Sequence, residues 1–150
     1  MTESNRMIKV YLDMNIYNRP FDDQAQVRIR LETIAVFSIL QHIKDGDLQL
    51  LWSFVIDYEN SLNPYEDIRQ EIAQISSLAA ETIPPDEAIL KSAQSFENMG
   101  LKPRDALHLA CALKGGAEYF LTCDDKLIKK TMNVNLKVMN PVMFVEEVEV

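Results

Sequence analysis

The sequence predicts an α/β protein with a mostly parallel central sheet and helices on both of its faces. Short apolar stretches bounded by turn residues alternate with longer stretches of helical periodicity along the chain. Strands of a sheet that is covered on both faces are apolar throughout, as these stretches are. The chain has 150 residues and shows no repeat, linker or shift in composition, so we expect a single domain over residues 1–150.

The first half of the chain contains two expected strands and three expected helices. They are a strand over residues 7–12, a polar turn-rich stretch over 15–26, a helix over 27–44, a strand over 48–52 and helices over 53–62 and 65–79. Ser53 is a suitable N-cap for its helix, and Pro64 separates that helix from the next. The helix over 27–44 has an apolar stripe, the pattern of a helix that packs on a core. The stripe consists of Val27, Leu31, Ile34 and Ala35 and is widened by Phe37, Leu40 and Ile43.

The second half continues the alternation of strands and helices. Gly100 is a suitable stop for one helix, and Pro103 suits the first turn of the next, which Gly115 and Gly116 end. The expected elements are a short edge strand over 81–83, helices over 86–99 and from 103, a strand over 119–121, a short helix over 124–130, a strand over 136–139 and a C-terminal segment from 141.

The composition excludes several classes of protein. With 47% hydrophobic and 25% charged residues, the chain is neither disordered nor of low complexity. Its net charge of −8 gives no general attraction for a phosphate backbone. Cys111 and Cys123 form no disulfide framework and no metal-binding spacing, and we expect both to be small buried hydrophobic residues. No apolar stretch is long enough for a membrane span or a signal peptide, so we expect a cytoplasmic protein with no membrane partner.

Carboxylates occur where an α/β fold places its ligands, at the carboxyl ends of parallel strands. One follows the first strand, one lies on the helix after the second strand, one begins the helix before the fourth strand, and one follows that strand. They are Asp13, Glu59, Asp105 and Asp124, with Asp125 as the reserve for Asp124. The sequence has no GxGxxG, P-loop, HExxH or GxSxG motif, so dinucleotide, nucleotide, zinc-protease and esterase chemistry are disfavoured.

Each carboxylate also has a purely structural explanation. Asp13 can end a strand, Asp105 suits the positive end of a helix dipole, and Asp124 can cap the helix that follows. Glu59 is preferred to Asp57 because a helical wheel places it near an apolar stripe and turns Asp57 away. That stripe consists of Val55, Tyr58 and Leu62.

The helix that contains Asp105 reads DALHLACAL and is apolar nearly all round, which predicts burial. A carboxylate that enters a buried helix needs a partner, which favours a functional role for Asp105. His108 follows on the same side of this helix and fits a satisfied core histidine, or one that supports a site residue, better than a metal ligand.

Several carboxylates in one pocket stay ionised only if a cation neutralises them. Oxygen ligands suit Mg²⁺ and Mn²⁺, which activate water and stabilise the charge of a phosphoryl-transfer transition state. Basic residues flank the acidic positions and would form a positive rim that holds a nucleic-acid backbone, although an ordinary solvated helix face explains them equally well. They are Arg19, Lys102, Arg104, Lys126, Lys129 and Lys130.

The segments YLDMN, SFVIDYEN, RDALHLACAL and YFLTCDDKL, in this order, resemble the PIN-domain ribonucleases, including the toxins of bacterial toxin–antitoxin pairs. The resemblance covers nearly the whole chain and implies a three-layer α/β/α sandwich. It also implies Mg²⁺- or Mn²⁺-dependent cleavage of single-stranded RNA, and we expect an antitoxin protein and a second copy of the chain as partners. Carried over by motif, the acidic quartet is Asp13, Glu59, Asp105 and Asp124, with Asn15 and Thr122 as supporting polar groups. The chain departs from the family pattern at Met14, where a small hydroxyl residue is frequent, and in the long polar segment NRPFDDQAQ.

Three functional hypotheses follow. The first is a metal-dependent endoribonuclease. The second is a catalytically inactive PIN-like module that acts through protein contacts. The third is another α/β phosphoryl-transfer protein with an aspartate nucleophile, such as a receiver domain or a phosphatase. The segment DMN lacks the second Asp of the phosphatase pattern, and Asn140-Pro141 stands where a receiver has a lysine, so the third hypothesis is the weakest.

Overall fold

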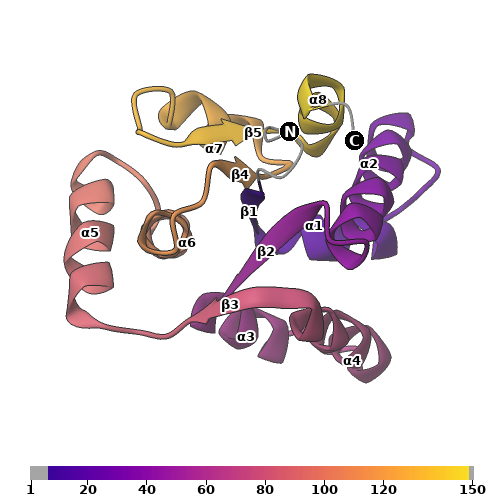
Figure 1. Cartoon of the computed structure of the whole chain (residues 1–150), viewed down its shortest axis with the longest axis horizontal. Helices are drawn as coiled ribbons and strands as arrows, with labels where there is room; N and C mark the ends of the chain where they lie inside the picture. Colours follow the sequence, from indigo (N-terminus) through magenta and orange to yellow (C-terminus); the bar gives the residue numbers. More distant parts are fainter. Residues whose placement is uncertain (1–6, 149–150) are drawn as a thin grey trace.

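The computed structural model describes residues 7–148 and contains one five-stranded parallel sheet, ordered β3-β2-β1-β4-β5. The strands are β1 (Ile8–Leu12), β2 (Leu48–Ser53), β3 (Ala79–Ile83), β4 (Tyr119–Leu121) and β5 (Lys137–Met139). Helices cover both faces: α5 and α6 lie on one side of the sheet and α2 and α8 on the other (Figure 1). The fold is therefore the predicted three-layer α/β/α sandwich, and β3 is an edge strand as expected.

The helices and short 3₁₀ turns connect these strands in nearly the predicted order. They are α1 (Met14–Asn18), η2 (Arg19–Phe21), α2 (Val27–Lys44), α3 (Phe54–Ser61), α4 (Glu66–Ile75), η3 (Ser76–Leu78), α5 (Glu87–Asn98), α6 (Pro103–Lys114), α7 (Asp125–Lys130) and α8 (Pro141–Val148). None of the helices within residues 7–148 is long and apolar enough to cross a membrane.

The central strand β1 brings the two halves of the chain together. Its residues pair with β2 on one side and with β4 on the other, with Leu12 opposite Leu121. The backbone N–H of Asp13 then donates to the Leu121 carbonyl oxygen at 2.9 Å. The carboxyl ends of β1 and β4 therefore lie next to each other, and the residues after them share one edge of the sheet.

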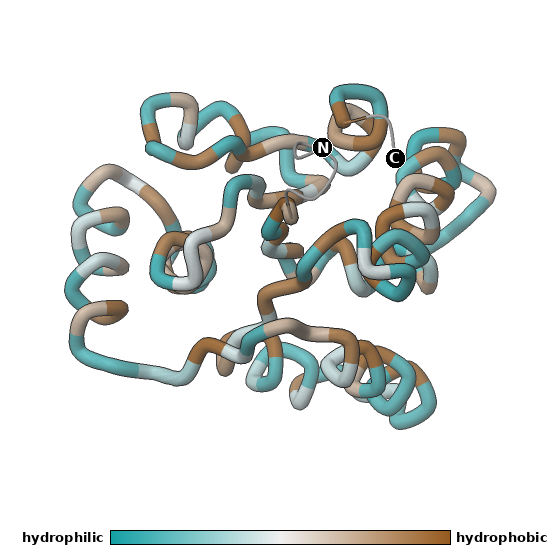
Figure 2. Tube along the Cα trace, viewed as in Figure 1, coloured by the Kyte–Doolittle hydropathy of each residue, from teal (hydrophilic) through white to brown (hydrophobic). Residues whose placement is uncertain are grey.

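Helix α6 is buried, as its apolar sequence predicts, because it lies between α5 and the sheet. Figure 2 shows hydrophilic residues on the outer side of α5. Helix α5 thus lies between α6 and the solvent. Gly115 ends α6 where the chain passes very close to β2, since a Cβ there would lie 2.7 Å from Leu51 Cδ1. Gly116 follows with φ of 77°, a conformation that residues with side chains rarely adopt.

The bounds predicted for α2 are correct, but its predicted packing face is right only in part, since Ala35 and Ile43 are buried as predicted. Val27, Leu31, Ile34 and Phe37 are between 52% and 61% exposed. The buried face lies on the neighbouring stripe, which consists of Glu32, Thr33, Ala35, Val36, Ile39 and Ile43. The predicted and buried stripes overlap at Ala35 and Ile43. Hydropathy placed the rest of the packing face on the wrong side because the buried stripe includes the carboxylate of Glu32.

Two other local predictions differ from the structure. The polar stretch after β1 contains the helix α1, which buries Met14, Ile16 and Tyr17. Its single turn is too short for helical periodicity to be recognised in the sequence. The helix predicted over 65–79 ends at Ile75, and Ala79 begins β3 after η3.

Candidate active site

Asp13 lies at the end of β1, where a polar network holds its carboxylate in place. Asp13 is buried, and its Oδ1 accepts the Met14 N–H at 2.8 Å, which caps α1. Thr122 Oγ1 and Asn15 Nδ2 both donate to Asp13 Oδ2, at 2.8 and 3.2 Å. Asn15 also donates to Thr122 Oγ1 and accepts the Cys123 N–H, both at 3.0 Å. Asn15 and Thr122 thus join β1, α1 and the end of β4. Both lie beside Asp13, a member of the acidic quartet that they were predicted to support.

Glu59 lies on α3 and takes part in a second network through the buried His108 of α6. Its Oε1 contacts His108 Nε2, and its Oε2 lies 3.4 Å from Arg104 Nη1. The other ring nitrogen of His108 lies 2.6 Å from the Tyr11 hydroxyl, which in turn lies 2.7 Å from Ser53 Oγ. His108 therefore has hydrogen-bond partners at both nitrogens and fixes the carboxylate of Glu59.

The helical-wheel preference for Glu59 agrees with the structure, although the stripe behind it does not. Asp57 is exposed and accepts the Trp52 indole N–H at 2.8 Å, away from the other carboxylates. Val55 is buried, but Tyr58 and Leu62 are more than half exposed. Glu59 thus reaches inward past the edge of a much narrower apolar face.

Asp105 and Asp124 are half-buried and come from α6 and the end of β4. Asp124 caps α7, because its Oδ1 accepts the N–H groups of Lys126 and Leu127 at 2.9 and 3.3 Å. Its own N–H donates to Thr122 Oγ1 at 3.1 Å, which connects it to the Asp13 network. Asp125 instead points to Arg28 and forms two hydrogen bonds with it, both at 2.8 Å. The structure therefore separates the two neighbouring carboxylates, and Asp124 is the one that faces the other acids.

The electrostatics of the site show that these carboxylates influence one another. Burial raises the pKa of Asp105, and the nearby charges of Asp13 and Asp124 raise it further. Burial also raises the pKa of Asp13, and the hydrogen bonds and charge that His108, Thr122 and Met14 supply only partly oppose this. Burial acts on Glu59 in the same direction, but His108 and Arg104 outweigh it, so the pKa of Glu59 is lowered. The charges of Asp13 and Asp124 thus act on Asp105, whereas His108 and Arg104 stabilise the charge of Glu59.

The donor set fits a hard divalent cation in its chemistry. Asp13, Asp105 and Asp124 offer carboxylate oxygens, and the mutual repulsion that raises the pKa of Asp105 is what a cation would relieve. Within residues 7–148, however, no group of three or more His, Cys, Asp or Glu side chains is already arranged around a common point for a metal ion. Glu59 is held by His108 and Arg104, so ion binding needs side-chain adjustment at this position.

A third polar cluster, which the sequence did not predict, holds the turn after β4 from the opposite side. Glu32 on α2 is buried and forms ion pairs with Arg19 and Arg28, both at 3.1 Å. It also accepts Asn140 Nδ2 at 2.5 Å, while Arg28 reaches the Cys123 carbonyl at 3.4 Å and Asp125. The i,i+4 pair with Arg28 looks like an ordinary surface ion pair in the sequence, and the contacts with Arg19 and Asn140 that accompany the burial of Glu32 appear only in the fold. Because Arg19 pairs with Glu32, it does not belong to the predicted basic rim.

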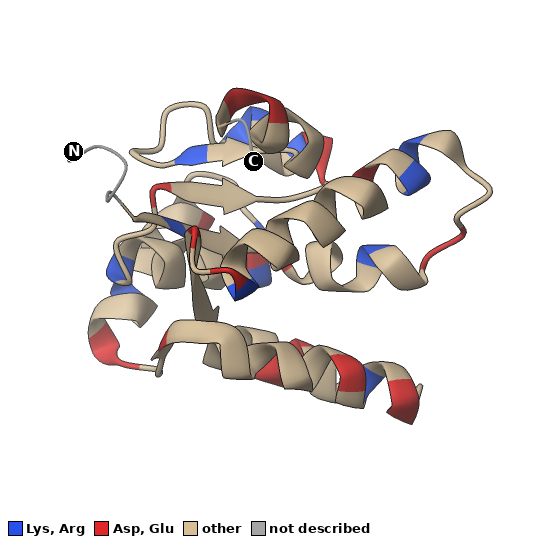
Figure 3. Cartoon of the chain, turned by 45° about the vertical axis from the view of Figure 1, so that its right-hand side comes forward, with Lys and Arg blue, Asp and Glu red and all other residues tan. Residues whose placement is uncertain are grey.

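The remaining basic residues of the predicted rim, Lys102, Arg104, Lys126, Lys129 and Lys130, are exposed. In the view of Figure 3 the basic residues are scattered over separate elements and alternate with acidic ones. Cys111 and Cys123 are free and buried, as expected.

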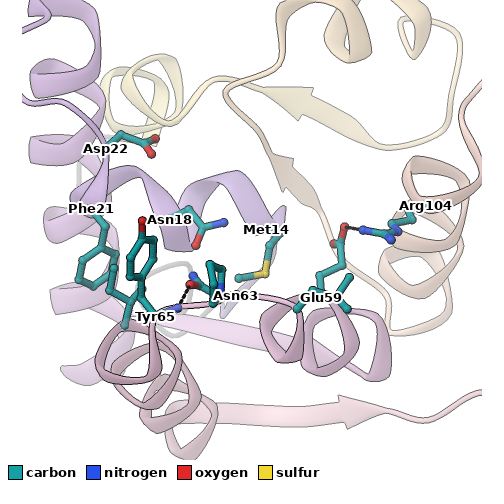
Figure 4. A pocket seen from close by; sticks show the side chains of 11 residues that line it. Met14, Asn18, Phe21, Asp22, Glu59, Asn63, Tyr65 and Arg104 are labelled. Atoms are coloured by element: carbon teal, nitrogen blue, oxygen red, sulfur yellow. Dashed lines mark hydrogen bonds and ion pairs between the residues drawn. The ribbon is translucent and has the colours of Figure 1, made fainter.

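A pocket of about 430 Å³ opens beside Glu59 (Figure 4). It lies between α1 and η2 on one side and the α3–α4 connection on the other. Its lining consists of Met14, Asn18, Phe21, Asp22, Glu59, Leu62, Asn63, Pro64, Tyr65, Ile68 and Arg104. A ligand that reaches Glu59 therefore has a neighbouring hollow that takes part of it.

Solved structures share this fold at low sequence identity. VapBC2 from Rickettsia felis bound to a promoter DNA fragment matches with a TM-score of 0.59 and 16% identity, over 89% of this chain and 98% of that chain. VapBC-1 from nontypeable Haemophilus influenzae matches with a TM-score of 0.59, 17% identity and the same coverage. PAE2754 from Pyrobaculum aerophilum matches with a TM-score of 0.54 and 14% identity, over 97% of this chain and all of that chain.

No curated protein matches the chain by sequence. The profile of the PIN domain, in contrast, matches residues 10–131, which run from β1 to the end of α7 and include all four candidate acids. The matched range is most of the chain, and the resemblance inferred from the four sequence segments is therefore confirmed. This chain belongs to the PIN-domain family, whose members are generally nucleases.

Proposed function

We propose that this chain, as a single PIN-like domain over residues 1–150, is a metal-dependent endoribonuclease that cleaves single-stranded RNA. The observation that carries the proposal is the concentration of Asp13, Asp105 and Asp124 around the ends of β1 and β4, close enough for their charges to raise the pKa of Asp105. Keeping neighbouring carboxylates ionised is unfavourable unless a cation neutralises them, and such clusters are found at functional sites.

In this proposal Asp13, Asp105 and Asp124 hold Mg²⁺ or Mn²⁺, and Glu59 ligates the ion through water or orients the attacking water. The ion, when bound, supplies an acidified water and stabilises negative charge on the phosphoryl group. Asn15 and Thr122 keep the Asp13 carboxylate in one orientation through their hydrogen bonds to its Oδ2. His108 keeps Glu59 turned toward the other acids, and Asp125 takes no part because Arg28 holds it.

We propose two protein partners, an antitoxin and a second copy of the chain. Two of the structural neighbours are VapBC2 and VapBC-1, and α2 exposes the apolar residues Val27, Leu31, Ile34 and Phe37. Contiguous exposed apolar surface is a feature of protein-interaction sites. The proposal includes a cytoplasmic location, where such a partner and the RNA meet the enzyme.

The test is RNA cleavage by the Asp13→Asn variant in Mn²⁺. The substitution removes one negative charge while the amide keeps the size of the side chain, so we expect loss of at least about 100-fold in rate, as for other groups that act on the transition state. Asp57→Asn is the matched control, because Asp57 is exposed and its amide still accepts the Trp52 hydrogen bond. Undiminished cleavage by Asp13→Asn in a clean preparation would refute the proposal.

The second candidate, a catalytically inactive PIN-like module, is favoured by the engagement of Glu59 with His108 and Arg104 and by the exposed stripe on α2. The two candidates differ in whether the folded chain binds Mn²⁺. A ligand that binds only the folded state raises the melting temperature, so a thermal melt with millimolar Mn²⁺ separates them. An unchanged midpoint supports the inactive module.

A further inference from the structure

The pocket beside Glu59 combines aromatic rings at one end with the candidate catalytic carboxylate at the other. Figure 4 shows Phe21 and Tyr65 at the end away from Glu59 and Arg104, with Met14 and Asn63 between them. A polymer bound at the acids therefore passes an aromatic surface within the same hollow. The pocket volume of about 430 Å³ is ample for one planar base.

The aromatic rings of the pocket are exposed, and within residues 7–148 no other ring stacks on them. Tyr65 is 64% exposed and Phe21 is 39% exposed. Exposed aromatic side chains are the surfaces on which proteins stack unpaired bases, because every base has a flat π-face. The side-chain amides of Asn18 and Asn63 line the same pocket and carry the donors and acceptors that read base edges.

The wall that presents Tyr65 is held by hydrogen bonds. Asn63 Oδ1 accepts the Tyr65 N–H at 2.9 Å, and Arg69 Nη1 donates to the Asn63 carbonyl at 2.7 Å. Asn60 Nδ2 donates to the Arg69 carbonyl at 2.9 Å and joins α3 to α4. The ring of Tyr65 is thus carried by a fixed connection, which lowers the entropy that binding must overcome.

The charges of the pocket favour a neutral ring over a phosphate. Asp22 and Glu59 are acidic, and each already pairs with an arginine: Arg19 Nη1 lies 2.9 Å from Asp22, and Arg104, the one cation that lines the pocket, lies 3.4 Å from Glu59 and over the ring of Tyr58. A phosphate in this hollow would meet two carboxylates, whereas an uncharged base would not be repelled.

We propose that this pocket binds one unpaired nucleobase of the RNA strand, next to the bond that is cleaved, with Tyr65 and Phe21 as its stacking platform. The inference rests on the proposed ribonuclease function and assigns to it a base-binding subsite. The subsite requires single-stranded substrate, because a paired base is not free to leave its stack.

The test couples a protein substitution to the removal of one base. An unstructured RNA of about 15 nucleotides that the wild-type chain cleaves in Mn²⁺ is prepared with a single abasic site at each position near the cleaved bond. We expect Tyr65→Ala to lower kcat/KM on the intact RNA by about 5-fold to 100-fold, the range for loss of one stacked base. One abasic position should lower the wild-type kcat/KM by a similar factor and lower that of Tyr65→Ala by less than about two-fold, because the two changes remove the same contact.

Leu90→Ala is the matched control, since Leu90 is 57% exposed on α5 and does not line this pocket. It should leave kcat/KM and the effect of every abasic site unchanged. If the effects of Tyr65→Ala and of each abasic site simply multiply, the base subsite is refuted. If Tyr65→Ala has no effect at all, the pocket serves a protein side chain instead, and the inference fails while the ribonuclease function stands. If the wild-type chain cleaves no unstructured RNA, the proposed function itself fails.

Discussion

His108 Nδ1 lies 2.6 Å from the hydroxyl oxygen of Tyr11, although the two residues are 97 positions apart in the chain. Tyr11 is on the central strand, and His108 is on the buried helix α6, whose other ring nitrogen contacts Glu59. The orientation of a carboxylate at the site is therefore set by two fully buried side chains behind it. Such a network is strong when every member has a partner and costly when one is missing.

Replacing Tyr11 with Phe should destabilise the protein by about 1–3 kcal/mol, because Ser53 and His108 lose a buried hydrogen-bond partner. Urea denaturation at neutral pH measures this difference. Tyr58→Phe is the matched control, since Tyr58 is more than half exposed, and its effect should stay within about 0.5 kcal/mol. Equal stabilities for the two variants would show that the buried network contributes nothing.

Replacing Asp105 with Asn should raise stability in the absence of metal. The pKa of Asp105 is raised by burial and by Asp13 and Asp124, so the folded chain favours the protonated form. Its contribution to stability is present at low pH and is lost as the pH rises through the raised pKa, which leaves an unfavourable charge at pH 7. Thermal melts in a chelator should show a higher midpoint for the variant at pH 7 and a shrinking difference toward about pH 4.

The same variant should lose the stabilisation that Mn²⁺ gives. At a concentration 100 times the dissociation constant, an ion that binds only the folded state adds about 2.7 kcal/mol to wild-type stability. A variant that gains as much as the wild-type chain from Mn²⁺ would remove Asp105 from the ion site.

Asp124→Asn and Asp125→Asn should have opposite consequences for cleavage. Asp124 faces the acidic cluster, whereas Asp125 is an exposed partner of Arg28. We expect Asp124→Asn to abolish RNA cleavage in Mn²⁺ and Asp125→Asn to retain most of it. An exposed ion pair is worth at most about 1 kcal/mol, so Asp125→Asn should also melt near the wild-type temperature. The reverse ranking of the two activities would exchange the roles of the two residues.

Replacing Glu32 with Ala should destabilise the fold by about 3–5 kcal/mol, the usual effect of breaking a buried ion pair from one side. The change removes the buried carboxylate that pairs with Arg19, which is only 18% exposed and keeps only Asp22 at its Nη1, and it removes an acceptor of Asn140. Chemical denaturation measures the loss, and Glu81→Ala on the exposed edge of the sheet is the control. A loss below about 1 kcal/mol would mean that solvent replaces the pairing without penalty.

The positions of the site residues were predictable because they follow from topology. Alternating strands and helices fix a parallel sheet, and the carboxyl ends of its strands meet at one edge, which brings Asp13 near Thr122 and Asp124. The preference for Glu59 over Asp57 came from a helical wheel, although Tyr58 and Leu62 of the stripe behind it are exposed. These predictions needed only the order of elements and the direction of side chains.

The buried polar contacts were not predictable in this way. Glu32 is recognisable as a core residue only when Arg19, Arg28 and Asn140 are known to surround it, and Asn140 is 108 positions away. Hydropathy therefore assigned the neighbouring stripe of α2 to the core. The choice between Asp124 and Asp125 likewise depended on Arg28, since both residues suit a helix start in the sequence.

The hydrogen bond from Thr122 to Asp13 joins residues that are 109 positions apart. During synthesis, the N-terminal strand leaves the ribosome long before the segment that completes its surroundings. A nascent chain that ends before Tyr119 has neither β4 nor Asp124, so the acidic site proposed for RNA cleavage is still incomplete at that stage. The order of strands thus delays the assembly of this centre until translation is almost finished.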